Sequence, residues 1–124
     1  MDSLVLFVAL TPGQFQEFQE KGSCKPDQFS GRFGLRKTAE EAIERSHYFM
    51  NWTSWTSFEN MYDKKDFVLL KITITARGFL TLMEQDILVR RKPNQYQLHG
   101  DLQEQVMEGE SLLFQVDKEA FTVS

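Results

Sequence analysis

Two long hydrophobic runs stand out along the chain, and each predicts a buried strand. Leu4–Leu10 is apolar at every position. Residues 66–74 have β-branched and apolar residues at both odd and even positions, and therefore on both faces of a strand. Such strands are covered on both faces of their sheet. Shorter patterns predict further strands at residues 31–37, 86–91, 95–99 and 111–116, and a short strand or turn at residues 103–107. The pattern of residues 75–84 does not decide between helix and strand.

Two helices are predicted, and each follows a strand. Each begins at a threonine with a glutamine or glutamate three residues later, which is the capping-box pattern of a helix start. At Thr11 this box opens a helix over residues 12–21, which Gly22 ends. At Thr38 it opens a helix over residues 39–50, whose apolar side chains recur at spacings of three and four.

Length and composition fit a single domain that covers residues 1–124. A chain of 124 residues with 41% hydrophobic content can bury a core without disulfides or metal. Its 11 phenylalanines predict a core rich in aromatic side chains. The order of the elements predicts an α+β fold, in which two helices of the N-terminal half pack on a mostly antiparallel sheet.

The charge of the chain restricts its expected partners. The formal net charge of −4 argues against a surface that tracks nucleic-acid phosphates, so no nucleic-acid partner is expected. Arg90, Arg91 and Lys92 form the one basic run, which we interpret as a solvated strand end or turn. The first hydrophobic run is too short to span a bilayer, so no membrane association is expected.

Cysteine and histidine are scarce, which restricts the chemistry. Cys24 is the single cysteine, so no intramolecular disulfide and no cysteine zinc site can form, and a reducing cytoplasm is the expected compartment. His47 and His99 are the only histidines and lie far apart, so no metal site is expected, and no cofactor is predicted. We interpret His47 as a hydrogen-bonded residue at a helix edge. His99 precedes a glycine at a strand end, where a ligand could approach closely.

Polar side chains alternate along two of the predicted strands and define a candidate site. Arg32 and Arg36 share one face of the first strand, and Gln95, Gln97 and His99 share one face of the other. If these faces coincide, Arg36 and His99 lie on the same side of the sheet, close enough to contact one small anionic ligand that carries a phosphate or carboxylate. The alternative is that both faces are solvated sheet surface.

Four segments spread over residues 4–107 match, in order, short motifs of one protein family. Residues 7–11 correspond to its Tyr-His-Ile-Thr strand, and residues 32–38 to its Gly-Phe-Ile-His-Cys-Ser-Thr motif. Residues 66–72 correspond to its Asp-Leu-Val-Leu-Leu-x-Ile strand, and residues 96–102 to its Pro-His-Leu-Tyr-Gly-Pro-Leu motif. The chain thus resembles a family of small, mostly bacterial proteins of unknown function, which implies an ADP-ribosyltransferase-like fold with a cleft.

The chain departs from this family at the histidines. Ala9, Leu35 and Gln97 stand where the family has histidine, and of these three only Gln97 can still form a side-chain hydrogen bond. A cleft of this kind would therefore bind without reacting, or react by other groups. The resemblance implies that its polar lining consists of Arg36, Thr38, Gln97 and His99.

These observations lead to three hypotheses of function. The first is a non-catalytic protein that binds a ligand or partner on an ADP-ribosyltransferase-like scaffold, because the family histidines are replaced. The second is a divergent enzyme that acts on NAD or another nucleotide. The third is an oligomeric interaction module, such as a homodimer, that uses an open sheet edge or the aromatic segment of residues 52–62. The alternative for this segment is that it forms a lid or part of the core.

Overall fold

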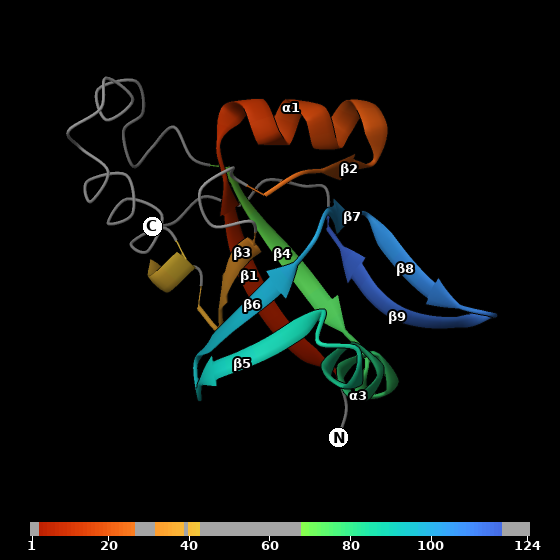
Figure 1. Ribbon diagram of the computed structural model, residues 1–124. Coiled ribbons are helices and arrows are strands. Elements are labelled where there is room, and N and C mark those ends of the chain that lie inside the picture. The colour runs from red at the N-terminus through yellow and green to blue at the C-terminus, as the bar shows by residue number, and fades with distance from the viewer. Residues whose placement is uncertain (1–2, 27–31, 39, 43–67, 118–124) are drawn as a thin grey trace.

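The computed structural model describes residues 3–26, 32–38, 40–42 and 68–117. The strands are β1 (Leu4–Leu10), β2 (Ser23–Cys24), β3 (Arg32–Arg36), β4 (Val68–Ile74), β5 (Leu88–Lys92), β6 (Gln95–His99), β7 (Leu102–Gln103), β8 (Gln105–Glu108) and β9 (Ser111–Val116), and the helices are α1 (Pro12–Lys21) and α3 (Ala76–Glu84). Seven strands form a curled antiparallel sheet in the order β5-β6-β3-β1-β4-β9-β8, and β2 pairs with β7 in a second sheet (Figure 1). The α+β class and the antiparallel sheet are as predicted.

Several elements form where the sequence pattern placed them. The bounds of β1, α1 and β9 are those predicted. The capping box of α1 is complete, because Gln14 N donates to Thr11 Oγ1 over 3.2 Å and Thr11 N donates to Gln14 Oε1 over 3.0 Å. Gly22 ends α1 at a φ of 75°, in the left-handed region that favours glycine. Residues 103–107 differ from the prediction, because they contribute to both β7 and β8, which belong to different sheets.

The segment whose pattern was undecided forms the helix α3. Thr75 is its N-cap, and Thr75 Oγ1 accepts a hydrogen bond from Gly78 N over 2.9 Å. Leu82 is buried in the main core, with Phe79 and Met83 packed against that core at helical spacing. No helix within the described ranges is long and apolar enough to cross a bilayer.

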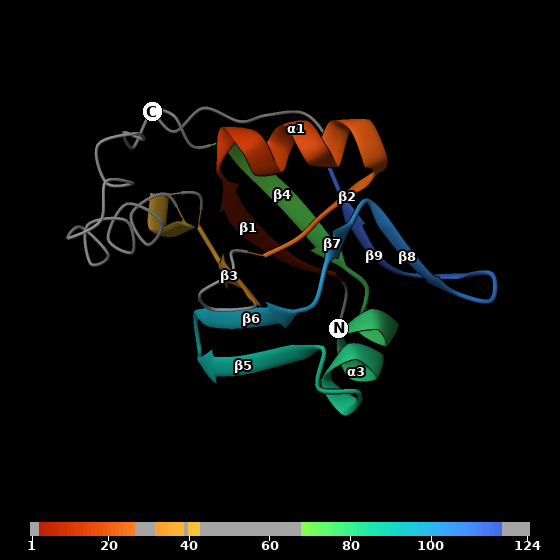
Figure 2. The ribbon, with the colours of Figure 1, turned by 45° about the horizontal axis from the view of Figure 1, so that its top comes forward.

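One face of the large sheet carries the main hydrophobic core. Leu6, Val8 and Leu10 of β1 point to this face and are at most 1% exposed. Phe18 of α1 and Leu82 of α3 belong to the same buried cluster, and the two helices lie at opposite ends of the central strands (Figures 1 and 2). Each such side chain contributes about 1.5–3 kcal/mol relative to exposure, so this cluster fixes which face of each strand is buried.

The opposite face of the sheet, which we call the polar face, carries a smaller apolar cluster at one end. It consists of the buried Leu69 and Ala42, with Phe7 and Ala9 packed against them. Because Ala42 lies in the first turn of the second predicted helix, that helix begins on the face opposite Phe18. The remainder of residues 39–50, with His47, and the aromatic segment of residues 52–62 lie outside the described residues.

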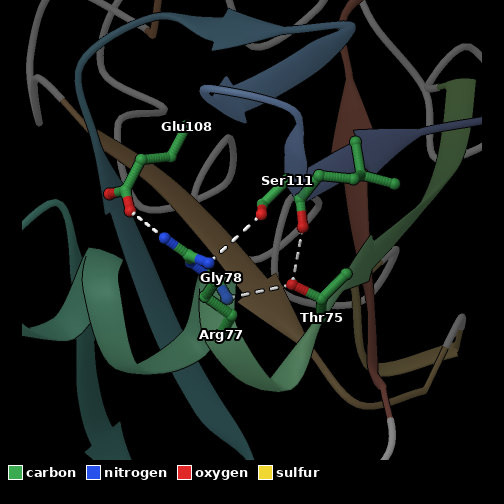
Figure 3. Close-up of polar contacts among 6 residues, drawn as sticks. Thr75, Arg77, Gly78, Glu108 and Ser111 are labelled. Carbon is green, nitrogen blue, oxygen red and sulfur yellow. Dashed lines mark hydrogen bonds and ion pairs between the residues drawn. The ribbon is translucent and has the colours of Figure 1, made fainter.

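The first turn of α3 is fastened to the hairpin of β8 and β9 (Figure 3). Thr75 N donates to Leu113 O over 3.0 Å. Arg77 donates to Ser111 Oγ over 3.2 Å and forms an ion pair of 2.6 Å with Glu108. Both members of this ion pair are exposed, and such pairs contribute about 0–1 kcal/mol, so the attachment depends mainly on the backbone contacts.

Gly78 is the position at which α3 approaches β9 most tightly. A Cβ added there would lie 1.9 Å from Leu113 O, so Gly78→Ala must displace backbone. We expect this variant to lose about 1–3 kcal/mol of the free energy of unfolding, the usual cost of overpacking, as measured by urea denaturation.

Gly13, in the first turn of α1, provides the matched control. An added Cβ meets nothing within 4 Å there, so Gly13→Ala is expected to stabilise the fold by up to about 1 kcal/mol. Equal stabilities of Gly78→Ala and Gly13→Ala would contradict the close packing of α3.

Candidate functional site

Strand pairing brings the two predicted polar strands side by side. In the register of β3 with β6, the directly opposite pairs on the polar face are Arg32 with His99, Gly34 with Gln97, and Arg36 with Gln95. Residues directly opposite each other in a sheet project from the same face. Arg36 and His99 therefore share a face, as predicted, while Phe33 and Leu35 of β3 point to the main core.

Arg36 and His99 are nevertheless well separated along the strands. The register places them four residues apart, which corresponds to about 13 Å at the rise of a strand. Arg36 is only 8% exposed, and its Nη1 donates to Leu35 O over 3.5 Å. Arg36 thus adds positive charge beneath the surface, at the opposite end of the β3–β6 pairing from His99.

His99 is held at the end of β6 by its backbone. His99 N donates to Ile87 O over 2.8 Å. Its side chain is half-buried, and Nε2 is covered and has no hydrogen-bond partner. A ligand at the solvent surface would not reach this nitrogen without a local rearrangement.

Thr38 has a local structural role. Glu41 N donates to Thr38 Oγ1 over 3.2 Å, and Ala42 N donates to Thr38 O over 3.2 Å. These are the bonds of a helix N-cap, as the sequence predicts. The hydroxyl is therefore engaged in the start of the helix.

Gln97 is oriented by an arginine whose contribution the sequence did not reveal. Arg91 Nε donates to Gln97 Oε1 over 2.9 Å. In the β5–β6 pairing Val89 lies opposite Gln97, so Arg91 reaches the Gln97 amide from two residues further along β5. Since its carbonyl oxygen accepts from Arg91, the Gln97 amide presents its NH2 group as a donor.

Gly34 leaves an open position at the centre of these groups. It is exposed, and an added Cβ would meet nothing within 4 Å. Its backbone does not require glycine, because Gly34 has no positive φ. Arg32 and Arg36 flank it on the same face, and Gln97 lies opposite. We call these residues together the Gly34 site: Gly34, Arg32, Arg36, Gln97 and Arg91.

The three strands around this site carry no acidic residue, and two of them, β3 and β5, are basic. β3, β5 and β6 contain no aspartate or glutamate, although the chain as a whole carries a formal charge of −4. Their cations are Arg32, Arg36, Arg90, Arg91 and Lys92. A surface region of one sign attracts ligands of the opposite sign, so this part of the sheet favours anions.

A cavity lies away from the two strands, β3 and β6, between which the sequence predicts a cleft. It has a volume of about 430 Å³ and is lined by residues on and beside β4 and β9, namely Lys71, Thr73, Glu104, Gln115, Val116 and Asp117. The hydrophobic run of residues 66–74 contained one signal for it, since Lys71 is the single cation within that run.

Cys24 offers no reactive thiol. It is 1% exposed, and its backbone is paired with β7. Burial, together with the smaller effects of the nearby carboxylates of Glu17 and Asp101, raises the pKa of the Cys24 thiol to about 12. The thiolate, which is the nucleophile, is therefore strongly disfavoured at neutral pH. Within the described ranges, no group of three or more His, Cys, Asp or Glu is placed to hold a metal ion.

Comparison with known proteins assigns no function to these residues. No protein-family model, no curated protein and no solved structure matches the chain. The resemblance to small proteins with an ADP-ribosyltransferase-like fold gains no support from them. The roles of residues must therefore be argued from the geometry alone.

The protection of Cys24 can be tested with a thiol reagent and by pH titration. At pH 8 we expect the native thiol to react with Ellman's reagent about a hundredfold or more slowly than the thiol of the urea-unfolded chain, because the native thiol is buried and protonated. The unfolded thiol loses its proton near pH 9.0, whereas the folded thiol keeps it up to about pH 12.

Stability should consequently fall as the pH rises above about 9, because the unfolded state then binds fewer protons than the folded state. Cys24→Ala serves as the reference, since it lacks this contribution and retains all other titrating groups. Rapid labelling of the native thiol, or identical alkaline stability profiles for both proteins, would contradict the assignment.

Proposed function

We propose that this chain is a non-catalytic binding domain whose ligand carries a phosphate or carboxylate, and that the Gly34 site receives this anionic group. The observation that carries the proposal is the open position over Gly34 in the middle of a basic, rigid sheet. A side chain at this position would fill the space that the anion occupies. Glycine leaves the backbone and the groups beside it accessible to a small ligand.

The chemistry of the flanking groups supports anion binding. Arg32 lies two residues from Gly34 on the same face, about 6.6 Å along the strand, within the reach of an arginine side chain. Guanidinium groups match phosphate and carboxylate oxygens in a two-pronged geometry. The NH2 group of Gln97, oriented by Arg91, adds a neutral donor from the opposite strand. Buried Arg36 contributes positive charge from below.

The rigidity of the region supports binding at low entropic cost. β3 pairs with β6 along its whole length, and β6 pairs with β5 on its other side. Donors on regular strands are already placed before the ligand arrives, so less conformational freedom is lost on binding. The Arg91–Gln97 contact fixes the amide in the same way.

A size series at Gly34 tests the site without changing any charge. We expect Gly34→Leu to weaken the binding of inorganic phosphate and of ADP at least tenfold, or about 1.4 kcal/mol, with Gly34→Ala intermediate. Stability should be kept or raised, since glycine weakens a strand and the added side chain meets open space. Calorimetric titration at 0.15 M salt gives the affinities, and thermal unfolding gives the stabilities.

Gly13→Leu is the matched control, because it adds the same side chain at an open glycine in the first turn of α1, outside β3, β5 and β6. Unchanged binding by Gly34→Leu would show that the anion binds elsewhere. A wild-type chain that binds neither phosphate nor ADP would contradict the proposed function itself. Consumption of NAD or ADP during these titrations would favour the enzyme hypothesis instead.

A second variant tests the donor on β6. Gln97→Glu keeps the shape of the side chain and can retain the contact with Arg91, but it replaces the NH2 donor by a negatively charged oxygen. We expect phosphate binding to fall at least tenfold while the thermal midpoint stays within a few degrees. Gln16→Glu, on the exposed face of α1, makes the same change of charge away from the site. Equal phosphate affinities of these two variants would remove Gln97 from the site.

A further inference from the structure

Lys92, the last residue of β5, lies beside the Gly34 site. The strands β5, β6 and β3 lie side by side at one edge of the sheet (Figure 2). Lys92 lies opposite Gln95 in the β5–β6 pairing, and Gln95 lies opposite Arg36 in the β3–β6 pairing. Because opposite residues project from the same face, Lys92 and Gln95 lie on the polar face. They form the row next to that of Gly34 and Gln97.

The register shift of β5 turns Lys92 to this face. Arg90 lies opposite Tyr96, which is buried in the main core, so strict alternation from Arg90 would place Lys92 on the core side as well. The pairing instead shifts between Arg90 and Lys92, and Arg91 is the extra residue. Arg91 and Lys92 consequently both serve the polar face, where Arg91 donates to Gln97. Irregularities of this kind re-aim side chains beside functional sites.

Lys92 and Gln95 offer two donors to a ligand. Lys92 is exposed and Gln95 is half-buried. Within the described ranges, neither side chain makes a hydrogen bond or an ion pair. Their Cβ atoms lie about 5 Å apart as an opposite pair, so an ammonium and an amide can reach one group between them. We call Lys92 and Gln95 together the Lys92 subsite.

The register fixes how far this subsite lies from the open position over Gly34. That position lies between β3 and β6, in the row of Gln97, whereas the Lys92 subsite lies between β6 and β5 in the next row. One strand spacing is about 4.8 Å and two residues along a strand span about 6.6 Å, so the two centres lie about 8 Å apart. Two phosphates joined through a single oxygen are too close together to occupy both.

We propose, in an inference that rests on the proposed function, that the ligand of the Gly34 site is a small bisphosphate with its two phosphates on separate carbons. One phosphate lies over Gly34, and the second is bound by Lys92 and Gln95. A phosphate monoester carries a charge of about −1.5 to −2 at pH 7. The hairpin of β5 and β6 supplies cations and contains no aspartate or glutamate, so it suits a second group of this charge.

The proposal is tested by calorimetric titration of the full chain with a sugar bisphosphate and its two monophosphates. Fructose 1,6-bisphosphate carries phosphates at both ends of six carbons. We expect it to bind at least tenfold more tightly than fructose 1-phosphate or fructose 6-phosphate, because each monophosphate fills one subsite only. Pyrophosphate, which cannot span both subsites, and adipate, which has carboxylates at the ends of six carbons, should also bind more weakly than the bisphosphate.

Variants locate the second phosphate. Lys92→Met keeps most of the length of the side chain and removes its charge, and it should weaken bisphosphate binding at least tenfold. Gln95→Met removes the amide at similar size and should weaken the same binding to a smaller extent. Both variants should leave the binding of inorganic phosphate close to that of the wild-type chain. Lys25→Met, at an exposed position after β2, is the control and should change neither affinity.

The two proposals fail in different ways. The bisphosphate inference is overturned, and the anion site at Gly34 stands, if phosphate binds but the bisphosphate binds no more tightly than its monophosphates. It is also overturned if adipate or pyrophosphate equals the bisphosphate, or if Lys92→Met and Gln95→Met both bind it like the wild-type chain. If neither phosphate nor the bisphosphate binds, or if Gly34→Leu weakens neither, the proposed function fails and the inference fails with it.

Discussion

The pairing of β1 with β4 is the constraint on which the remaining geometry depends. The two strands pair without interruption along the whole of β1, at the centre of the seven-stranded sheet. Side chains alternate strictly between faces. A slip of β1 by one residue would bury Phe7 and expose Leu6, and a slip of β4 would bury Lys71 and expose Ile72. The hydrophobic effect excludes both slips. The Gly34 site and the cavity beside β4 and β9 inherit their face of the sheet from this register.

The sequence predicted the fold best where the local pattern was unambiguous. β1 is an unbroken apolar run, and α1 has a capping box at its start and a glycine at its end, and the structure confirms both elements. α3 was undecided because Gly78 and the threonines around it weaken the helical pattern. Gly78 is required there by the close approach to Leu113, which is a tertiary contact that no local pattern contains. The prediction at residues 103–107 joined two strands that belong to different sheets, since the sequence does not show where a chain changes sheet.

The candidate sites were predictable only in part, because their geometry also depends on tertiary contacts that no local pattern contains. Alternation along β3 and β6 correctly placed Arg36 and His99 on one face. The distance between them depends on the register, and the burial of Arg36 depends on its surroundings, so neither could be predicted from the sequence. Arg91 reaches Gln97 across the pairing of β5 with β6, and the basic run gave no sign of this contact. The cavity depends on the pairing of β4 with β9, to which only the charge of Lys71 within a hydrophobic run gave a clue.

The irregular pairing of β5 also governs how one side of the sheet ends. The β5–β6 pairing shifts between Arg90 and Lys92, so the outermost strand β5 carries an extra residue. The β8–β9 pairing shifts between Val106 and Met107, but there the extra residue, Leu113, lies on the inner strand β9. A regular edge offers evenly spaced backbone donors and acceptors to which a strand of another molecule can add. A bulge breaks that spacing and increases the local twist. The β5 edge therefore resists extension by a further strand, and cations along β5 repel a second copy of that edge. A homodimer formed by joining two β5 edges would have to straighten this strand first.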